Sequence, residues 1–332
     1  VPRNFLETKK RINKLINFFE KKKLKKGDRV FILSSNRVEW AEIDLAVMSL
    51  GGITVPSFVT NNLADNKFII QDCRPKFIFL ENKKIFEKNK NFLDKKKNKI
   101  ILIEDCKVFN NYPHILQNFS SKNTNKYSPV ENDISSIIYT SGTTGNPKGV
   151  VLTHKSIMHN LLGALEVMSD FKLKDEKLIS FLPLSHSYER MAGLYFPILI
   201  CAEIFFCSSL DKLLNEIKEV QPTILSAVPR FYENIYKKIK LQINKSNFFT
   251  SFILKKIFNY NNEPNSLKNF LNIFLVKILI SIFLKKKISK QFGGKIKIFI
   301  SGGAALNPDI GKFFNKLGFT LLQGYGQTEA SP

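Results

Sequence analysis

Short apolar segments alternate with helical patterns along most of this 332-residue chain. Residues 29–33, 53–55, 76–80 and 100–103 have the length and composition of strands, and the segments between them carry apolar residues at helical spacing. A strand, a helix and a second strand in this order form a parallel pair, because the helix carries the chain back across the sheet. The alternation predicts an α/β fold with mostly parallel strands.

The alternation resumes after a polar connection at residues 118–133, which is rich in Ser, Asn, Lys and Pro. A central strand is expected at 134–139, followed by a strand at 150–152 and a helix that Thr153 caps and that extends to Met168. Later strands are expected at 178–182, 204–206, 223–225, 296–300 and 319–322, and later helices at 191–200, 210–220, 231–239 and 308–317. We therefore expect one large domain with two sheet lobes, at about residues 1–133 and 134–332.

The loop after the central strand has an unusual composition. From Tyr139 to Val150 it reads Y-T-S-G-T-T-G-N-P-K-G-V, with four Ser or Thr hydroxyls, three glycines and one lysine. Glycine lets the backbone approach a bulky anion, and successive N–H groups, hydroxyls and Lys148 match a polyphosphate. The loop is not a Walker A motif, because Pro147 precedes the lysine and Gly149 follows it. A simple turn between two strands is the alternative interpretation.

Two further polar loops follow strands later in the chain. Ser301-Gly302-Gly303-Ala304 comes after strand 296–300, and its paired glycines would let a flat ring lie on bare backbone, with a helix-entry turn as the alternative. Residues 324–329, G-Y-G-Q-T-E, offer an aromatic ring, a hydroxyl and a carboxylate, and Mg2+ favours one or two carboxylates together with phosphate oxygens. Ligands of open parallel sheets lie at the carboxyl ends of strands, so the three loops together predict an ATP·Mg site.

The formal net charge of +23 invites a nucleic-acid or membrane-surface interpretation. Only seven of the positive residues are arginine, and Lys, Asn, Ile and Phe, which share A/T-rich codons, are all abundant. A compositional bias therefore explains the excess, and lysine runs such as residues 21–23 and 95–97 are interpreted as solvated surface. The sequence contains no helix-turn-helix, zinc-finger or aromatic-interleaved basic motif, and we do not expect nucleic-acid binding.

Cysteine spacing and apolar runs limit the remaining classes. Cys73, Cys106, Cys201 and Cys207 lack the spacing of a metal site or redox pair and are expected to be reduced thiols of a cytoplasmic protein. The longest apolar run, Phe270–Leu284, is interrupted by polar residues and is shorter than the roughly 20 residues of a spanning helix. It is expected to form a buried helix, with a membrane-surface or acyl-chain-facing role as the alternative.

Three motifs carry a resemblance to a known family. The order S-G-T-T-G-x-P-K-G at residues 141–149 resembles the phosphate loop of the adenylate-forming enzymes, which include acyl-CoA synthetases, luciferases and peptide synthetase adenylation domains. L-P-L-S-H-S-Y-E-R at 182–190 and A-V-P-R-F-Y-E at 227–233 resemble signatures of the AMP-forming long-chain fatty acyl-CoA synthetases. The resemblance covers essentially the whole chain and implies the large N-terminal adenylation domain of that fold.

The resemblance implies roles for the matching residues. Lys148, His186, Thr328 and Glu329 would form the catalytic set, with His186 against the carboxylate and the acyl-adenylate. Residues 140–145 with Lys148 would hold the triphosphate, 302–304 and 324–325 the adenine, and Thr328 the α-phosphate, while Thr140 and Glu329 would bind Mg2+. The full nucleotide and phosphate set would be Thr140, Ser141, Gly142, Thr143, Thr144, Gly145, Lys148, Gly302, Gly303, Ala304, Gly324, Tyr325, Gly326, Gln327 and Thr328. Glu189, Arg190 and Arg230 are interpreted as scaffold, the first two as an ion pair at a helix start.

The activity that the resemblance implies is ATP-dependent conversion of a long-chain fatty acid to acyl-adenylate and then acyl-CoA, with coenzyme A as co-substrate and AMP and pyrophosphate as products. The alternatives are ligation of another carboxylic acid, acyl transfer to a carrier protein, and a non-catalytic nucleotide or acyl binder associated with a membrane. A cytoplasmic protein is expected, with peripheral contact at the membrane face as a secondary interpretation. Nothing in the sequence supports an oligomer.

The family has further parts beyond the portion that this chain matches. They are an aspartate that grips the ribose hydroxyls, a hinge, and a small C-terminal domain that carries the lysine for adenylation. None of them is found in residues 1–332, so the chain is expected to be a fragment of the large domain. We expect residues 1–332 alone to bind ATP weakly and to produce no acyl-CoA.

Overall fold

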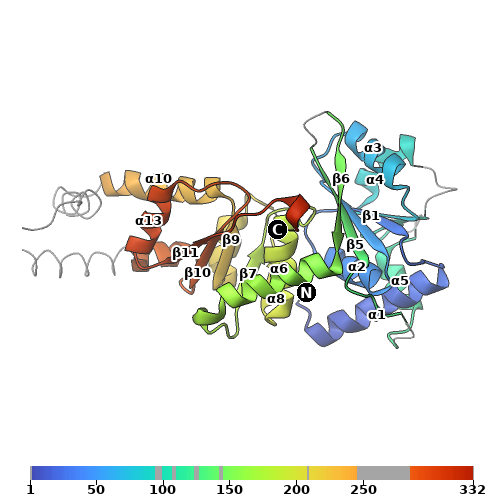
Figure 1. The fold of residues 1–332 in the computed structure, drawn as a ribbon, viewed down its shortest axis with the longest axis horizontal. Helices are drawn as coiled ribbons and strands as arrows, with labels where there is room; N and C mark the ends of the chain where they lie inside the picture. Colours follow the sequence, from blue (N-terminus) through green and yellow to red (C-terminus); the bar gives the residue numbers. More distant parts are fainter. Residues whose placement is uncertain are drawn as a thin grey trace, which may run out of the picture. The chain divides into compact units, whose positions relative to one another are not determined.

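The computed structural model describes residues 2–93, 99–106, 110–122, 127–141, 145–207, 209–244 and 285–331 (Figure 1). The chain divides into two compact units, each with its own sheet. The first unit comprises residues 1–172, 182–199 and 327–332, and the second comprises residues 173–181 and 200–326. The apolar run Phe270–Leu284, which was expected to form a buried helix, lies outside the described residues.

The first boundary between the units follows Lys172, whereas the sequence pattern predicted a boundary between residues 133 and 134. The central strand β5 (Ile134–Thr140) pairs in parallel with β2 (Ile53–Ser57), so it belongs to the first sheet. The polar connection before β5 marks a surface loop, but such a loop can join two strands of one sheet as well as two lobes. The prediction of a lobe boundary between residues 133 and 134, which was based on composition, therefore differs from the boundary in the structure.

The first unit contains a six-stranded sheet with the order β4-β3-β1-β2-β5-β6. Its other strands are β1 (Arg29–Leu33), β3 (Phe77–Leu80), β4 (Lys99–Leu102) and β6 (Lys148–Thr153). Neighbouring strands are parallel except β5 and β6, which form an antiparallel hairpin. Only residues 141–147 lie between β5 and β6, too few for a crossover, so the chain reverses direction.

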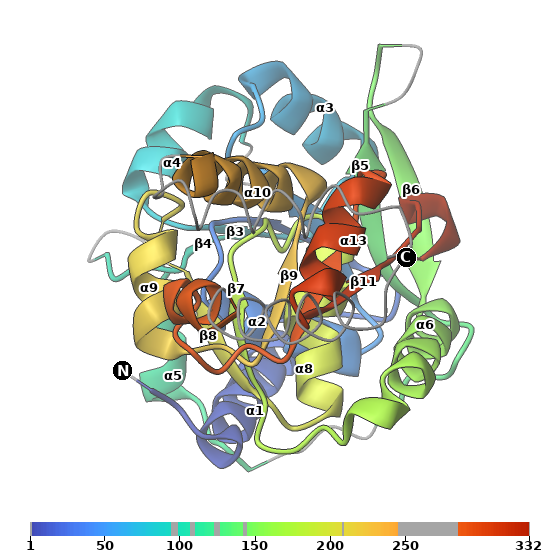
Figure 2. The same ribbon diagram turned by 90° about the vertical axis from the view of Figure 1, so that its left-hand side faces the viewer.

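Helices cover both faces of this sheet (Figures 1 and 2). α3 (Leu63–Cys73) and α4 (Lys83–Asn89) lie on one face, and α1 (Phe5–Lys21), α2 (Val38–Ser49) and α5 (Tyr112–Asn118) lie on the other. Asparagine side chains cap four of these helices by accepting a backbone hydrogen bond in the first turn. The four caps are Asn4, Asn62, Asn82 and Asn111.

The remaining helical segments of the first unit follow β6 or return from later in the sequence. α6 (His154–Val167) begins directly after β6, and Thr153 caps it as the sequence predicted. One continuous helical stretch then comprises α7 (Ser187–Glu189), the π-helix η3 (Arg190–Tyr195) and α8 (Phe196–Leu199). The described residues of the unit also include the single 3-10 turns η1 (Lys90–Phe92), η2 (Ser169–Phe171) and η4 (Thr328–Ala330).

The first unit has two apolar cores, one on each face of its sheet, and alternate strand residues point into one core or the other. Phe31, Ile78 and Leu102 pack with α3 and α4 residues such as Ile69 and Phe86. On the opposite face, aromatic rings of α1 meet the sheet edge-on: the Phe19 and Phe77 ring centroids are 5.3 Å apart, with an interplanar angle of 84°. Edge-to-face geometry of this kind is favoured by the ring quadrupoles. Both faces of the parallel strands β1–β4 are therefore shielded from water.

The second unit contains a five-stranded parallel sheet with the order β11-β10-β9-β7-β8. The strands are β7 (Lys177–Ser180), β8 (Glu203–Phe206), β9 (Ile224–Ala227), β10 (Ile298–Ser301) and β11 (Thr320–Gln323). Its described helices include α9 (Leu213–Val220), α10 (Pro229–Asn244) and α13 (Pro308–Lys316). The two sheets together confirm the predicted α/β class with mostly parallel strands.

One motif residue has a structural role in the second unit. Tyr232 of the A-V-P-R-F-Y-E stretch is fully buried, and its hydroxyl lies 2.8 Å from the Ile300 carbonyl oxygen and 3.0 Å from that of Leu225. Its ring packs edge-on against Phe299 and Phe314. Tyr232 therefore ties α10 to β9 and β10. Arg230, which was interpreted as scaffold, is instead exposed and forms no ion pair with the part of the chain that the structure describes.

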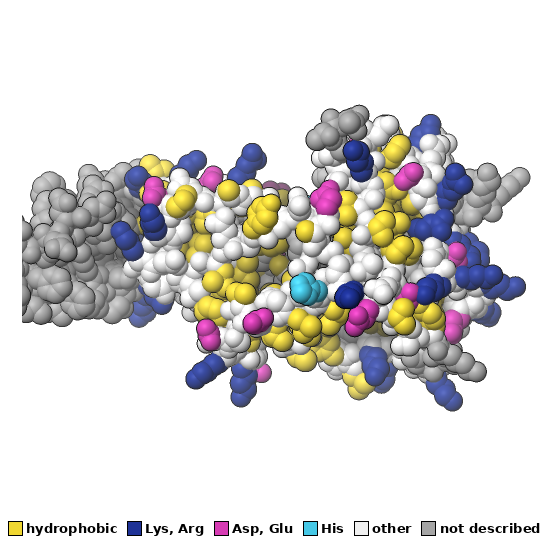
Figure 3. Space-filling model, viewed as in Figure 1, with side chains coloured by type: hydrophobic (Ala, Val, Ile, Leu, Met, Phe, Trp, Pro, Cys, Tyr) yellow, Lys and Arg dark blue, Asp and Glu magenta, His cyan; other side chains and the backbone are white. Residues whose placement is uncertain are grey.

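Charged side chains are spread over both units on the face that Figure 3 shows. None of the described helices combines the length and the apolar character that crossing a bilayer requires.

Candidate functional site

The loop with the unusual composition connects the two strands of the β5–β6 hairpin. Thr140 at the end of β5 pairs with Lys148 at the start of β6, and Tyr139 pairs with Gly149. Gly142, Thr143 and Thr144 lie outside the described residues. Lys148 is exposed and forms no ion pair with any described residue, so its charge is available to an anion. Lys148 therefore belongs to a strand edge that fixes its backbone, and only the residues between the strands form the loop.

The two described glycines of this loop do different things. Gly145 has a φ of +99°, a conformation that side chains rarely adopt, and open space surrounds it. Gly149 lies within β6, where a Cβ atom would come within 2.8 Å of Ile137 Cγ2 and 3.2 Å of Tyr139 Cζ. Gly145 thus meets a backbone requirement of the turn, whereas Gly149 meets a packing requirement of the hairpin.

Replacing Gly149 by alanine is expected to destabilise the protein by about 1–3 kcal/mol, because the added methyl group overpacks the hairpin. Gly163 within α6 is the matched control, since nothing lies within 4 Å of its Cβ position. There alanine should stabilise by up to about 1 kcal/mol through helix propensity. Urea unfolding of both variants measures the difference, and equal effects would contradict the packing role of Gly149.

A cavity of about 280 Å³ opens beside this hairpin in the first unit. Four of the predicted site residues line it: Thr140, Ser141, His186 and Thr328. Its other polar lining comes from Asn61, Asp65 and Ser187. The structure therefore brings together residues of the phosphate loop, of the L-P-L-S-H-S-Y-E-R stretch and of the final motif, which are far apart in the sequence.

His186 is the N-cap of α7, and one local hydrogen bond orients its imidazole. Its Nδ1 accepts a hydrogen bond from the Tyr188 backbone N–H at 3.1 Å, so the neutral ring carries its proton on Nε2. The ring is open to solvent through the cavity, yet neighbouring protein groups displace much of its hydration, and this desolvation lowers its pKa. At neutral pH the side chain is therefore an uncharged hydrogen-bond donor.

Two residues of the final motif belong to the turn η4 and have different environments. The Thr328 hydroxyl is half-buried and lies 3.0 Å from the Ser187 hydroxyl. The Glu329 side chain is exposed and pairs with no basic group in the described part of the chain. The Asn160 amide donates to the Ala330 carbonyl at 3.4 Å and so attaches the turn to α6.

The remaining predicted residues, except Gln327 of the first unit, lie in the second unit, at the carboxyl ends of β10 and β11. Ser301 pairs with Gln323 at the end of these parallel strands, and the Gly324 N–H donates to the Ser301 carbonyl at 2.8 Å. The Gly302–Ala304 turn and the Gly324–Tyr325 segment are therefore neighbours at one sheet edge. Gly303, Ala304 and all of residues 324–327 are exposed, with Tyr325 95% accessible. The chain passes from the second unit to the first between Gly326 and Gln327.

Arg190 is not paired with Glu189, as the sequence interpretation proposed, but with Asp44 of α2. The guanidinium is completely buried, and it also donates to the Thr54 hydroxyl at 2.5 Å. The Tyr195 hydroxyl donates to the same Asp44 carboxylate at 2.6 Å. Neighbours on one helix surface are three or four residues apart, so adjacent residues such as Glu189 and Arg190 point in different directions. The scaffold role of Arg190 is confirmed, with a different partner.

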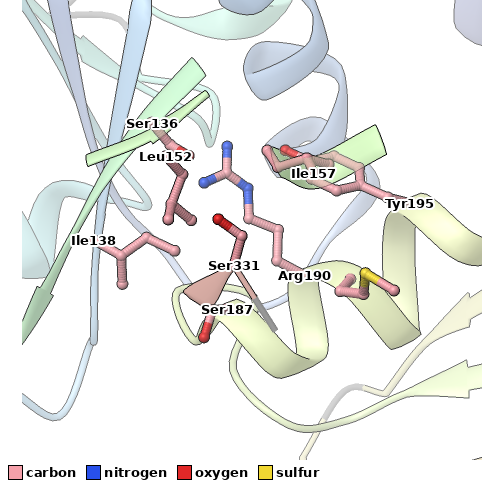
Figure 4. A pocket seen from close by; sticks show the side chains of 9 residues that line it. Ser136, Ile138, Leu152, Ile157, Ser187, Arg190, Tyr195 and Ser331 are labelled. Atoms are coloured by element: carbon pink, nitrogen blue, oxygen red, sulfur yellow. The ribbon is translucent and has the colours of Figure 1, made fainter. Parts of the chain in front are cut away.

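Figure 4 displays a small cavity beside this ion pair, with a volume of about 20 Å³. Ser136, Ser187, Arg190 and Ser331 are among its lining residues. The guanidinium Nη1 is buried and has no hydrogen-bond partner among the described residues. A cavity of this size holds about one water molecule.

Burial of His154, the first residue of α6, predicts a pH dependence of stability. Its Nε2 is buried without a partner among the described residues, and desolvation, with a smaller opposing effect of Asp133 and Asp44, lowers its pKa. The unfolded chain therefore binds more protons than the folded chain, and the free energy of unfolding should fall as the pH drops below about 6.5. Urea unfolding between pH 5 and 8 should show that the free energy of unfolding falls less at low pH in His154→Phe than in the parent protein. An equal fall in both proteins would contradict this role of His154.

Sequence reasoning gave no role to Ser187 or Asp44. Ser187 was part of a recognised motif, and its place directly after His186 was the available signal. No sequence signal marked Asp44, because an acidic residue in a helix is ordinarily expected to face solvent.

The fold defines the class: an α/β protein with two mostly parallel sheets and polar loops at the ends of its strands. The model of the AMP-binding enzyme family matches residues 3–332, and the chain belongs to this family. The chain spans about half the length of the curated relatives that it matches.

Two relatives and one solved structure illustrate the similarity. Long-chain-fatty-acid–CoA ligase FadD15 of Mycobacterium bovis is 27% identical over 321 residues, which cover 92% of this chain and 52% of that protein. The peroxisomal long chain acyl-CoA synthetase 6 of Arabidopsis thaliana is 29% identical over 328 residues, which cover 92% of this chain and 44% of that protein. ATP-bound MatB from Rhodopseudomonas palustris matches with a TM-score of 0.72 and 21% identity, over 98% of this chain and 55% of that one.

Proposed function

We propose that this chain is part of an ATP-dependent ligase that activates a long-chain fatty acid to an acyl-adenylate and then transfers the acyl group to coenzyme A. The observation that carries the proposal is the cavity that gathers Thr140, Ser141, His186 and Thr328. Family membership and the names of the relatives, which are long-chain fatty acid ligases and synthetases, support the same reaction. MatB, a structural neighbour, was solved with ATP bound.

The proposed roles follow the positions of the residues. Lys148 and the loop N–H groups of residues 140–145 neutralise the phosphates, and Thr328 donates its hydroxyl to the α-phosphate. The backbone of residues 302–304, in which Gly303 and Ala304 are exposed, and the exposed residues Gly324 and Tyr325 receive the adenine. His186, which carries its proton on Nε2, donates a hydrogen bond to the fatty acid carboxylate and later to the acyl-adenylate.

The reaction needs orientation and charge neutralisation from the protein. A carboxylate oxygen attacks the α-phosphorus, the bond from this phosphorus to the pyrophosphate oxygen breaks, and pyrophosphate leaves. The thiol of coenzyme A then attacks the acyl carbon, loses its proton and displaces AMP. Holding the attacking and leaving oxygens in line and neutralising charge on the phosphate oxygens account for catalysis without an enzyme nucleophile.

Mg2+ fits the donors that are present. No group of three or more His, Cys, Asp or Glu side chains is gathered for a metal within the described ranges, but Thr140 and Glu329 offer a hydroxyl and an exposed carboxylate. Mg2+ commonly takes one or two carboxylates together with substrate phosphates. When bound there, it would supply positive charge beside the phosphates.

We also propose a cytoplasmic location with peripheral contact at the membrane face. The supporting observation is the sign of the charge: with 51 basic against 28 acidic residues, the chain is attracted to an anionic membrane surface even where the lysine excess reflects composition.

The test is fatty-acid-dependent exchange of labelled pyrophosphate into ATP by the full-length gene product that contains this chain. Exchange requires the first half-reaction only, so it does not depend on coenzyme A. A ligase of this type should exchange pyrophosphate with palmitate but not without an acid, and a non-catalytic nucleotide binder should give no exchange with any acid. Exchange with a short or aromatic acid but not with palmitate would overturn the substrate class.

A further inference from the structure

One hydrogen bond joins two motifs that are 141 residues apart in the sequence. The hydroxyls of Ser187 and Thr328 lie 3.0 Å from each other, and both side chains line the cavity beside the phosphate loop. Ser187 is only 5% exposed, so water does not compete strongly for its hydroxyl. Ser187 also lines the smaller cavity at Arg190 (Figure 4). It therefore forms part of the boundary of both cavities.

Contacts on both sides of Ser187 fix its backbone. Before it, the Asn36 side chain donates to the Leu182 carbonyl at 2.6 Å and accepts from the Leu184 N–H at 2.9 Å. After it, the Arg190 N–H donates to the His186 carbonyl at 3.0 Å, and the Arg190 guanidinium is held by Asp44. A residue between two such attachments has little freedom to move away from its partner.

We propose that Ser187 is a positioning residue for Thr328. A hydroxyl has one proton to donate and two lone pairs to accept with. When the Ser187 hydroxyl donates to Thr328 Oγ1, the Thr328 hydroxyl can donate its own hydrogen bond to an anionic oxygen in the cavity. Hydrogen bonds in such a chain strengthen one another. A negatively charged phosphate oxygen can only accept a hydrogen bond from Thr328, so it favours the arrangement in which Ser187 donates to Thr328.

The inference rests on the proposed function, because it takes the α-phosphate of ATP as the anion that Thr328 contacts. Without Ser187, the Thr328 hydroxyl loses its donor and can rotate away from the phosphate. The loss matters most when charge develops on the α-phosphate, so it should lower kcat more than it raises the KM for ATP.

The experiment is a double-mutant cycle in the full-length gene product, with palmitate-dependent pyrophosphate exchange as the readout. Ser187→Ala should lower kcat about tenfold, which is the usual effect of losing one hydrogen bond that supports the binding of a charged group. In a Thr328→Val background, which lacks the hydroxyl, Ser187→Ala should have no further effect. Ser187→Thr, which keeps a hydroxyl, should restore most of the activity.

Ser135→Ala is the matched control. Ser135 is also fully buried in the first unit, and its hydroxyl donates to the Leu152 carbonyl at 2.9 Å. This variant should lose a similar amount of stability in urea unfolding while it keeps exchange within about twofold of the parent, because its hydrogen bond has a similar length but does not involve Thr328.

The outcomes separate the two proposals. Suppose that the parent protein is active. The role of Ser187 alone is then overturned if Ser187→Ala exchanges pyrophosphate as fast as Ser135→Ala, or if Ser187→Ala lowers exchange equally with and without the Thr328 hydroxyl. A parent protein that gives no acid-dependent exchange overturns the proposed function, and the role of Ser187 with it.

Discussion

Replacing Lys148 by alanine in the full-length gene product is expected to lower palmitate-dependent pyrophosphate exchange by about 10²- to 10³-fold, the usual cost of removing one charge-stabilising donor from a preorganised site. Lys148 is anchored at the start of β6 opposite Thr140, and its charge is not neutralised by any acidic group among the described residues. Its whole charge is thus available to the phosphates.

Glu329→Ala is expected to give a loss of the same order, because the only acidic side chain of the final motif would be removed. Lys155→Ala and Glu166→Ala are matched controls, since both side chains are exposed on α6 and have no place in the proposed site. Exchange rates of the Lys148 or Glu329 variant within about twofold of these controls would contradict the assigned roles.

Arg190→Leu is expected to lower the free energy of unfolding by about 3–5 kcal/mol, which is the second large effect. The Arg190–Asp44 pair is fully buried, and removal of the cation leaves the Asp44 carboxylate without its counter-charge. The exposed Arg230 is the control, and Arg230→Leu should change stability by less than about 0.5 kcal/mol. Urea unfolding of the full chain measures both.

A double replacement tests the cause of this loss. Arg190→Leu combined with Asp44→Leu removes both charges, so it should be more stable than Arg190→Leu alone, because no unpaired charge stays buried. If Arg190→Leu is no more harmful than Arg230→Leu, or if the double variant is less stable than the single one, the buried ion pair is not the anchor of the α7–η3 segment.

Much of the fold could be predicted from local sequence. Strand β1 (Arg29–Leu33) has the predicted bounds, because polar residues mark its ends. Helix α3 (Leu63–Cys73) occupies the helical pattern expected between strands 53–55 and 76–80, and Asn62 caps it. The antiparallel hairpin of β5 and β6 is the main departure from the parallel pattern. The helix expected at residues 191–200 begins instead at Ser187, because His186 caps it with its side chain and the π-helix η3 follows.

The polar loops of the candidate site could also be predicted, because glycines, hydroxyls and a lysine after a strand have a recognisable chemistry. The contacts that organise these loops could not. Ser187 and Thr328 are 141 residues apart, and Arg190 and Asp44 are 146 residues apart, so no local periodicity relates them. Such pairs depend on how strands and helices pack in space. The predicted lobe boundary at residue 133 differs from the structure for the same reason, because the pairing of β5 with β2 is a long-range contact.

The most direct test of the central claim is a crystal structure of the full-length gene product with a non-hydrolysable ATP analogue and Mg2+. We predict that the triphosphate lies against Lys148 and residues 140–145, with the α-phosphate at the Thr328 hydroxyl and the adenine on the backbone of residues 302–304. An analogue bound elsewhere, with no phosphate oxygen within hydrogen-bond distance of Lys148 or Thr328, would contradict the account.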